Sequence, residues 1–274
     1  MLDRIPVLFG PTGSGKSKLS YSYAHSTGAI ILNMDSMQIY EGMDIGTAKP
    51  SKEDFKRAEH ALFNITTIDR PFSVYDYQQE ALRVIESNLG KKPLILVGGT
   101  GLYLSSLYYD FGFRSSEDPV ELDKRAPIDW DNPHRVQRYR ETGQVHPKEN
   151  RVRSELPLDI YYLHREREEL YSRIHDRVDA MIEEGLVDEV KSLLERYPLT
   201  EDSPLHKAIG YKEMLPFIYG KQSLEDCTKI LKMNTRRYAK RQITWVKNQY
   251  SLVHPLDATV DPSLLIETML NKGV

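Results

Sequence analysis

Cysteine is almost absent from this chain of 274 residues, and long apolar runs are absent altogether. The single cysteine, Cys227, has no partner for an internal disulfide, which excludes a disulfide-stapled secreted scaffold and favours a reducing compartment. No apolar run approaches the ~18 residues of a membrane span, and Met1–Pro6 lacks the basic-then-apolar layout of a signal peptide. We therefore expect a cytoplasmic protein with no membrane partner.

An excess of either sign of charge is also missing. Lys and Arg total 37 against 40 Asp and Glu, a net charge of −3, so any nucleic-acid site must be a local patch. The 8 histidines are scattered and accompany one cysteine, which leaves no spacing typical of a zinc site. Hydrophobic residues at 40% and charged residues at 28% are ordinary globular usage, which excludes disordered and collagen-like classes.

Short apolar runs alternate with helical patterns in the first hundred residues. The predicted strands are Ile5–Phe9, Ala29–Asn33 and Pro93–Val97, and the predicted helices between them are Lys18–His25 and Asp76–Leu89. Continuous apolar strands separated by helices predict an α/β fold with a parallel sheet covered on both faces. Asp159–Leu163 is the last predicted strand, and helices are predicted after it at Glu166–Glu184, Val187–Arg196, Tyr211–Tyr219 and Leu224–Trp245.

A glycine-rich loop stands between the first predicted strand and the first helix. It matches G-x-x-x-x-G-K-[ST] with the residues Gly10, Pro11, Thr12, Gly13, Ser14, Gly15, Lys16 and Ser17. Such a loop lets backbone N–H groups surround phosphate oxygens at the positive end of a helix. Lys16 supplies charge for the terminal phosphates and the Ser17 hydroxyl can ligate Mg²⁺. The loop therefore predicts a phosphate-compound site, without saying which compound.

Two further strand ends carry polar or small residues. Asp35 follows the second strand and could ligate Mg²⁺ through water, act as a general base, or cap the next helix. Gly98–Gly101, which includes the Thr100 hydroxyl, follows the third strand. Its small residues either allow a ligand to approach closely or form a tight turn that contacts no ligand.

Basic residues cluster at two places in the helical part. Arg173 and Arg177 are four residues apart on one helix face, which suits either a diphosphate or surface pairs with neighbouring acids. Residues 229–247 carry seven basic and no acidic side chains, with Tyr238 and Trp245 interleaved. This asymmetry is typical of a nucleic-acid partner, and the alternative is a solvated basic helix that packs its apolar residues on the core.

Four blocks taken together resemble the tRNA dimethylallyltransferase family, which prenylates N6 of the adenosine next to the anticodon. They are GPTGSGKS (10–17), DSMQIYEGMDIGTAKP (35–50), VGGTGLYL (97–104), and AIGYKEM (208–214) with TRRYAKRQITW (235–245). GLVDEV (185–190) and RIHDRVD (173–179) are also similar. The resemblance implies a P-loop-type parallel sheet whose loop holds dimethylallyl diphosphate with Mg²⁺, with no turnover of ATP.

The resemblance also implies roles for the matched residues. Lys16, Arg177 and the loop would stabilise the departing pyrophosphate, and Asp35 would be the general base that deprotonates N6 of adenosine 37. Thr100 would line the channel, and Ser36, Met37 and Gln38 would contact the flipped adenosine. The residues expected to bind the tRNA anticodon arm are Met233, Asn234, Thr235, Arg236, Arg237, Tyr238, Ala239 and Lys240.

The chain departs from the family between the third strand and the C-terminal helices. The family usually carries a longer helical insertion, so we expect a shortened one at 113–143 and weaker tRNA affinity without loss of chemistry. Either this member has a reduced insertion or the chain lacks residues of the natural protein. The predicted organisation is a P-loop core at 1–112 and 144–200, this insertion, and a helical region at 201–274, in a monomer.

Two other functions compete with prenyl transfer. A P-loop kinase would use Lys16 and Ser17 but would leave the basic helix without a role. An RNA-binding protein that uses the loop only as a switch would leave Asp35 and Thr100 without roles. A preference for dimethylallyl diphosphate over ATP discriminates the prenyltransferase from the kinase.

Overall fold

The computed structural model describes residues 4–109, 125, 126, 128, 130, 136, 139, 153–200, 203–249 and 253–271. The chain divides into two compact units, residues 1–103 with 157–274 and residues 104–156. Most of the predicted insertion at 113–143 lies outside the described residues. In the smaller unit, the Arg153 guanidinium lies over the Tyr108 ring, 5.1 Å from its centroid. The larger unit groups residues 201–274 with the predicted core.

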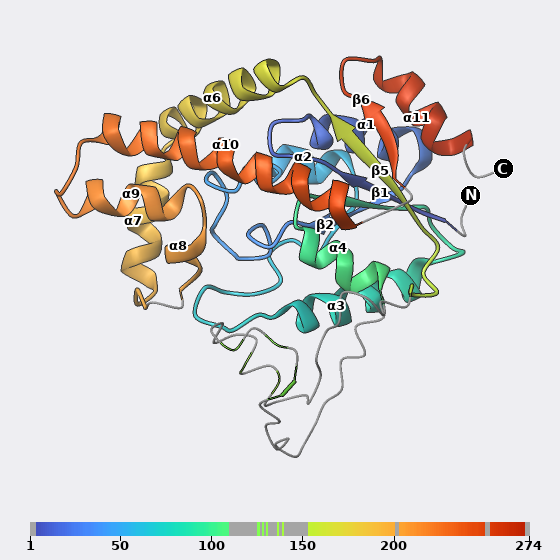
Figure 1. Ribbon diagram of the computed structural model, residues 1–274, viewed down its shortest axis with the longest axis horizontal. Helices are drawn as coiled ribbons and strands as arrows, with labels where there is room; N and C mark the ends of the chain where they lie inside the picture. Colours follow the sequence, from blue (N-terminus) through green and yellow to red (C-terminus); the bar gives the residue numbers. More distant parts are fainter. Residues whose placement is uncertain are drawn as a thin grey trace. The chain divides into compact units, whose positions relative to one another are not determined.

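A six-stranded parallel sheet forms the centre of the larger unit, in the order β3-β2-β4-β1-β5-β6 (Figure 1). The strands are β1 (Ile5–Phe9), β2 (Ile30–Met34), β3 (His60–Ala61), β4 (Leu94–Gly98), β5 (Leu158–His164) and β6 (His254–Asp257). The predicted α/β class and the four predicted strands are confirmed, with shifts of one residue at the ends.

The prediction that Asp159–Leu163 is the last strand is wrong. Strand β6 follows it in the chain and pairs in parallel with β5 at one edge of the sheet. It has only 4 residues and contains Pro255, which lacks a backbone N–H and is tolerated mainly at sheet edges. A segment this short carries too little apolar periodicity to be recognised in the sequence.

The helices of the described residues include four short or terminal elements that the sequence patterns did not predict, α2, α4, α8 and α11. Their bounds are α1 (Lys16–Thr27), α2 (Lys52–Arg57), α3 (Val74–Asn88), α4 (Gly101–Tyr108), α6 (Arg167–Glu183), α7 (Leu186–Arg196), α8 (Pro204–Lys207), α9 (Tyr211–Ile218), α10 (Leu224–Gln249) and α11 (Pro262–Asn271). No described helix combines the length and the low charge that crossing a bilayer requires.

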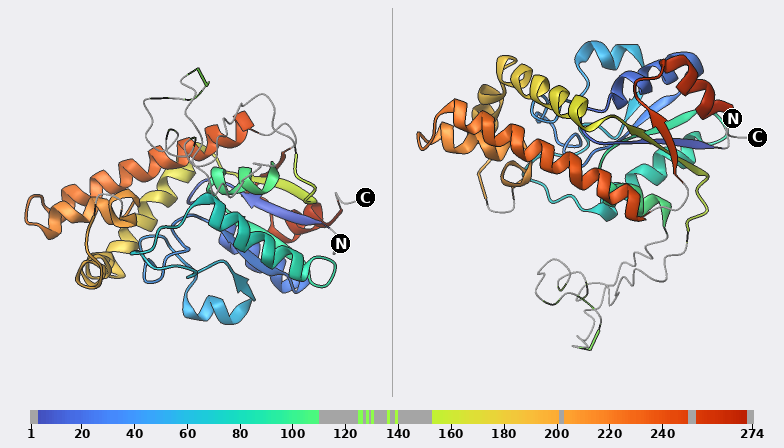
Figure 2. Two further views of the ribbon diagram at one scale, coloured as in Figure 1. Left: turned by 90° about the horizontal axis from the view of Figure 1, so that it is seen from below. Right: turned by 45° about the horizontal axis from the view of Figure 1, so that its top comes forward.

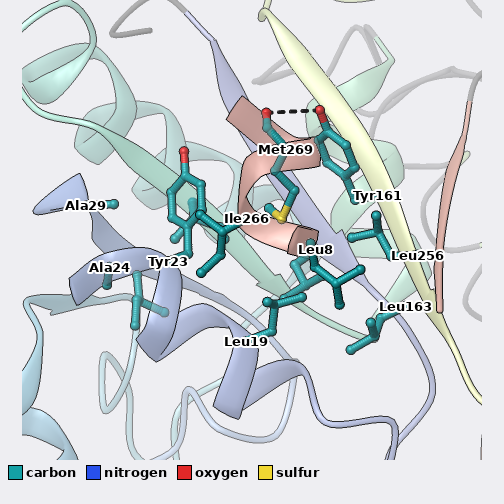
Figure 3. Packing of buried hydrophobic residues seen from close by; sticks show 13 residues of the cluster. Leu8, Leu19, Tyr23, Ala24, Ala29, Tyr161, Leu163, Leu256, Ile266 and Met269 are labelled. Carbon is teal, nitrogen blue, oxygen red and sulfur yellow. Dashed lines mark hydrogen bonds between the residues drawn. The ribbon is translucent and has the colours of Figure 1, made fainter. Parts of the chain in front are cut away.

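Helices cover the sheet on both faces. On one face, α1 and α11 pack over Leu8, Ile31 and Ile95, which belong to a single buried cluster with residues of both helices (Figure 3). Side chains alternate along a strand, so the intervening residues point to the opposite face. There α3 lies against the sheet (Figure 2), and the Tyr77 hydroxyl donates a hydrogen bond of 3.0 Å to the Asn33 carbonyl.

Helices α6 and α10 lie side by side beyond the carboxyl ends of the strands (Figures 1 and 2). The small residue Ala239 of α10 is fully buried with Leu170 and Ile174 of α6, which lets the two helices approach closely. Helices α7 and α9 pack at the end of this pair that lies away from the sheet (Figure 1). The pair therefore stands where parallel α/β sheets bind ligands.

We expect Ile266→Ala to lower the free energy of unfolding by ~3 kcal/mol, because it opens a cavity in the cluster between α11 and α1. Ile266 is 7% exposed and Leu264, on the same helix, is 55% exposed. Leu264→Ala is therefore the matched control and should change stability by less than ~0.5 kcal/mol. Urea denaturation measures both values, and equal losses in the two variants would contradict the packing of α11 on this face.

Candidate functional site

The glycine-rich loop runs from the end of β1 into α1. The Ser14 amide donates a hydrogen bond of 3.2 Å to the Pro11 carbonyl, which turns the chain back towards the helix. Gly13 and Gly15 have φ angles of 82° and 103°, which glycine adopts without strain. A Cβ at Gly13 would also lie 3.2 Å from Ile174 of α6. The loop therefore needs glycine both for its turn and for its contact with α6.

Lys16 is folded back over this loop. Its Nζ donates hydrogen bonds to the carbonyls of Gly10 and Pro11, at 2.8 and 2.9 Å. Burial, together with the nearby positive charge of Arg177, lowers the pKa of Lys16 to about 7, and the Asp35 carboxylate opposes both effects. An anion placed beside Nζ would favour the charged ammonium.

Asp35 directly follows β2 and is held by its own neighbours. The Asn33 side chain accepts a hydrogen bond from the Asp35 amide (2.9 Å) and donates one to the Asp35 carbonyl (3.1 Å). Oδ1 of Asp35 accepts from the Met37 amide at 2.9 Å. Residues 36–39 form a turn and not a helix, so Asp35 does not cap a helix. The other two interpretations of Asp35, as a general base and as a ligand of Mg²⁺ through water, stay predictions.

Thr100 joins the loop after β4 to the turn after β2. Its Oγ1 accepts a hydrogen bond from the Ser36 amide at 3.0 Å and donates to the Ser36 Oγ at 3.3 Å. The Tyr238 hydroxyl of α10 lies near the side chains of Thr100 and Gln242, and burial together with the Asp35 charge raises the pKa of Tyr238. Tyr238, predicted to bind tRNA, therefore reaches inward to the same place as Asp35.

Gln242 of α10 bridges two strand-end loops. Its Oε1 accepts from the Thr12 amide at 2.9 Å, and its Nε2 donates to the Gly99 carbonyl at 3.0 Å. A Cβ on Gly99 would lie 2.0 Å from this Nε2, and a Cβ on Gly101 would lie 2.3 Å from Trp245. These two glycines make room for α10, a close approach of protein that neither alternative from the sequence included, while Gly98 of the same stretch lines the cavity.

The two arginines predicted to share a diphosphate have different environments. Arg177 is partly buried near Asp35, and its Nη2 donates to the Thr47 carbonyl at 3.4 Å. Arg173 instead donates from Nε to the Gly13 carbonyl at 2.9 Å, on the outside of the loop. Arg165, which the sequence analysis did not single out, similarly donates to the Ser14 carbonyl. Arg173 and Arg165 thus support the loop, while Arg177 faces the cavity.

These elements enclose a cavity of about 270 Å³ at the carboxyl ends of the strands. Its cationic side chains outnumber its carboxylates five to one; the cations are Lys16, Arg177, Lys207, Lys212 and Arg241, and the carboxylate is Asp35. Thr12, Ser17, Ser36, Met37 and Gln38 also line it. Val178, Met181 and Leu231 form an apolar wall. The cavity can therefore accept an anion joined to an apolar group.

Two other polar groups of the predicted site lie elsewhere. The Ser14 hydroxyl is fully buried and has no hydrogen-bond partner within the described part of the chain. The Trp245 Nε1, predicted as part of a stacking aromatic, is likewise buried, against Gly101. Neither side chain belongs to the wall of the cavity.

The eight consecutive residues predicted to bind tRNA are spread over all faces of α10. Arg237 and Lys240 are exposed, whereas Ala239 is fully buried against α6. Arg236 hydrogen-bonds His175 at 2.8 Å, and the Asn234 side chain donates to Glu213 at 2.8 Å. An α-helix has 3.6 residues per turn, so a contiguous segment of eight residues cannot present every side chain to one partner.

The two remaining residues of that segment, Met233 and Thr235, are partly buried, and Thr235 lines the cavity. Two other cations of the helix are already paired: Lys229 with Glu225 at 2.6 Å and Lys232 with Asp179 at 2.6 Å. The basic charge open to a polyanion is therefore concentrated towards the second half of α10.

Besides Arg165, sequence reasoning missed two residues that organise the site. Gln242 stands within the quoted block TRRYAKRQITW and Glu189 within GLVDEV, but neither carries a charge pattern or spacing that signals a role. Glu189 accepts hydrogen bonds from the backbone of the loop after residue 43, at 2.8 Å from the Ile45 amide. Both side chains hydrogen-bond to backbone groups, and a side-chain motif does not predict such contacts.

Comparison with known proteins identifies the family. The sequence profile described as IPP transferase matches residues 38–131 and 120–249. The tRNA dimethylallyltransferase of Streptococcus sanguinis (strain SK36) is 37% identical over 273 residues, which cover 92% of each protein. That of Clostridioides difficile (strain 630) is 39% identical over 280 residues, covering 90% of each.

Solved structures give the same result. The full-length tRNA isopentenylpyrophosphate transferase from Bacillus halodurans superimposes with a TM-score of 0.79 at 34% identity, over 98% of this chain and 95% of its own. A eukaryotic dimethylallyltransferase acting on tRNA gives 0.78 at 28% identity, over 99% of this chain and 77% of its own. On sequence and structure together, this chain belongs to the IPP transferase family.

Proposed function

We propose that the protein transfers a dimethylallyl group from dimethylallyl diphosphate to N6 of adenosine 37 in tRNA and releases pyrophosphate. The observation that carries this proposal is the cavity in which Lys16, Arg177 and Asp35 meet beneath the basic helix α10. The names of the relatives, tRNA dimethylallyltransferase and tRNA isopentenylpyrophosphate transferase, support the same reaction. We expect the protein to act in the cytoplasm as a monomer.

The cationic side of the cavity suits the leaving group. As the bond between C1 of the allylic group and the diphosphate oxygen breaks, negative charge grows on pyrophosphate. Lys16 and Arg177 are preorganised by carbonyl contacts, so their charges can stabilise that oxygen without rearrangement. The apolar wall of Val178, Met181 and Leu231 suits the hydrocarbon of the donor.

Asp35 suits the role of general base. Its Oδ1 is occupied by the Met37 amide, and Oδ2 has no protein donor among the residues that the structure describes. Oδ2 would take the proton from N6 as the nitrogen lone pair forms the bond to C1. The adenosine must leave its stack to reach this depth, and Ser36, Met37, Gln38 and Thr100 are the proposed contacts of the flipped nucleotide.

The residues present fit a bound Mg²⁺. Ser17 and Asp35 bring oxygen atoms to the cavity, and no cluster of three His, Cys, Asp or Glu side chains occurs in the described ranges. Mg²⁺ in phosphate sites typically takes one or two protein ligands together with phosphate oxygens and water. Ser17 would hold the ion, which would supply further charge to the diphosphate.

We expect Asp35→Asn to lower the rate of prenyl transfer by about 10²–10⁴-fold, because the carboxamide cannot accept the N6 proton. Affinity for dimethylallyl diphosphate should stay within a few-fold of wild type. The assay incubates the protein with Mg²⁺, the donor and unmodified tRNA, then weighs the digested nucleosides by mass spectrometry, with ATP as a parallel control.

The matched control is Asp188→Asn, the same change at a position of α7 whose side chain is 85% exposed. It should leave the rate unchanged. Equal loss of transfer and of donor binding in Asp35→Asn would refute the role of base. Turnover of ATP without any prenylated adenosine would refute the proposed reaction itself.

We expect Arg237→Ala with Lys240→Ala to weaken tRNA binding and to lower the slope of log affinity against log salt by about 2, one for each lost phosphate contact. Both side chains are exposed on α10. The control is Lys56→Ala with Arg57→Ala, which removes two exposed cations from α2. Filter binding at several salt concentrations measures the slope, and identical slopes in the two variants would place the tRNA surface elsewhere.

Binding of pyrophosphate should take up a proton at Lys16. Because the pKa of Lys16 is about 7 in the unliganded protein, half the amines are neutral at that pH, and an adjacent anion restores their charge. The affinity contributed by Lys16 is then full below pH 7 and declines as pH rises above it. Calorimetry at pH 8 in two buffers of different ionisation enthalpy should detect the uptake.

Lys16→Arg is the control for this measurement, since a guanidinium stays charged throughout. The variant should bind pyrophosphate with less proton uptake than wild type, by up to one proton for each ligand bound. The same uptake in both proteins would show that the proton goes elsewhere.

A further inference from the structure

Glu189 on α7 lies outside the cavity wall, yet its carboxylate accepts four hydrogen bonds. Oε2 accepts from the amides of Asp44 and Ile45, at 3.2 and 2.8 Å. Oε1 accepts from the Gly46 amide at 3.1 Å and from the Tyr211 hydroxyl at 2.6 Å. Three consecutive backbone N–H groups therefore converge on one negative charge, an arrangement that fixes the local path of the chain.

The fourth donor, the Tyr211 hydroxyl, belongs to a side chain that is tightly packed against the same segment. Tyr211 begins α9 and is fully buried, and a Cβ at Gly46 would lie 2.5 Å from its ring. Burial and the neighbouring Glu189 carboxylate raise the pKa of Tyr211, which keeps the phenol protonated as a donor. Glycine at 46 thus lets the backbone reach both the ring and the carboxylate.

The segment fixed in this way continues directly into the cavity. The Thr47 carbonyl accepts hydrogen bonds from Arg177 Nη2 at 3.4 Å and from Gln38 Nε2 at 2.9 Å. Gln38 Nε2 also donates to the Ala48 carbonyl at 3.3 Å. Ala48 has a φ angle of 49°, a left-handed conformation that surrounding contacts must hold.

We propose that Glu189 is a positioning residue for the transfer reaction. It holds residues 44–48 in the shape that sets the Thr47 carbonyl against Arg177 and Gln38. It thereby fixes the guanidinium that faces the leaving group and the carboxamide that faces the nucleotide. This inference rests on the proposed use of the cavity as the site of the donor diphosphate.

The carboxylate cannot be replaced by a neutral group of the same shape. Each of its oxygens accepts from at least one backbone N–H, so both oxygens must be acceptors. A glutamine has one acceptor oxygen and one NH₂ group, and in either orientation the NH₂ faces a backbone N–H. At least one amide is then left without an acceptor, which strains the segment.

The test is Glu189→Gln, compared with Glu195→Gln at an exposed position of the same helix. For Glu189→Gln we expect a fall of about tenfold or more in kcat and several-fold weaker binding of inorganic pyrophosphate. We expect Glu195→Gln to stay within twofold of wild type. A melting temperature measured for each variant separates these effects from unfolding.

A double-mutant cycle with Arg177→Gln decides between positioning and general support. If Glu189 acts through Arg177, adding Glu189→Gln to Arg177→Gln costs several-fold less in kcat/KM than adding it to wild type, because one of the two groups that it positions is already gone. Equal fold-losses from Glu189→Gln in both backgrounds would overturn the proposal, as would an unchanged kcat in the single variant.

Tyr211→Phe keeps the inference testable if Glu189→Gln does not fold. It removes one of the four donors and leaves the backbone amides in place. We therefore expect a two- to threefold loss in kcat that becomes smaller in the Arg177→Gln background. Pyrophosphate affinity is measured without tRNA. A wild-type protein that binds pyrophosphate but prenylates no tRNA would refute the proposed function, whereas weaker pyrophosphate binding in Glu189→Gln would still support the role of Glu189.

Discussion

Five cations line one cavity with a single carboxylate, and two of them, Lys16 and Arg177, are drawn away from solvent beside it. Burial lowers the pKa of both cations, Arg177 lowers that of Lys16 further, and the Asp35 carboxylate opposes these effects. A buried charge without a partner is costly, since water no longer solvates it. Backbone carbonyls take the place of water here. Those of Gly10 and Pro11 accept hydrogen bonds from Lys16, and that of Thr47 accepts one from Arg177. Carbonyl dipoles hold these cations but leave their net charge available to an anion.

The sequence predicted the parts of this arrangement that depend on chain order. Strand ends of a parallel sheet meet at one edge, so the loop after β1, Asp35 after β2 and Thr100 after β4 could be expected together, and Asp35 and Thr100 both lie close to Ser36 and Tyr238. Helix faces were harder to predict. Arg173 and Arg177 are four residues apart, yet the first contacts the outside of the loop and the second faces the cavity. Their separation depends on the angle at which α6 crosses the loop, which is a tertiary property.

The segment 44–48 illustrates a second limit of sequence reasoning. Its shape is determined by Glu189 and Tyr211, which are more than a hundred residues away in the chain, and their contacts are with backbone amides and a glycine. A sequence motif is defined by its side chains, so contacts made by backbone N–H groups cannot be recognised from it. The one visible trace of these contacts in the sequence is Gly46. The sequence blocks around residues 46, 189 and 211 resemble the family, although none of them belongs to a phosphate-binding motif.

Helix α10 shows why net charge alone predicts a binding surface poorly. Its basic residues gave the strongest signal for nucleic acid, but Lys229 and Lys232 are neutralised by acids and Arg236 is turned towards His175. The inward face instead carries Ala239, Tyr238 and Gln242, which set the helix against α6 and against the loops after β1 and β4. Two hydrogen bonds to backbone groups fix the rotation of the helix about its axis. That rotation turns Arg237 and Lys240 to solvent while Tyr238 reaches Thr100 beside Asp35. The inward contacts, and not the number of charges, therefore determine where a bound polyanion would lie relative to the carboxylate.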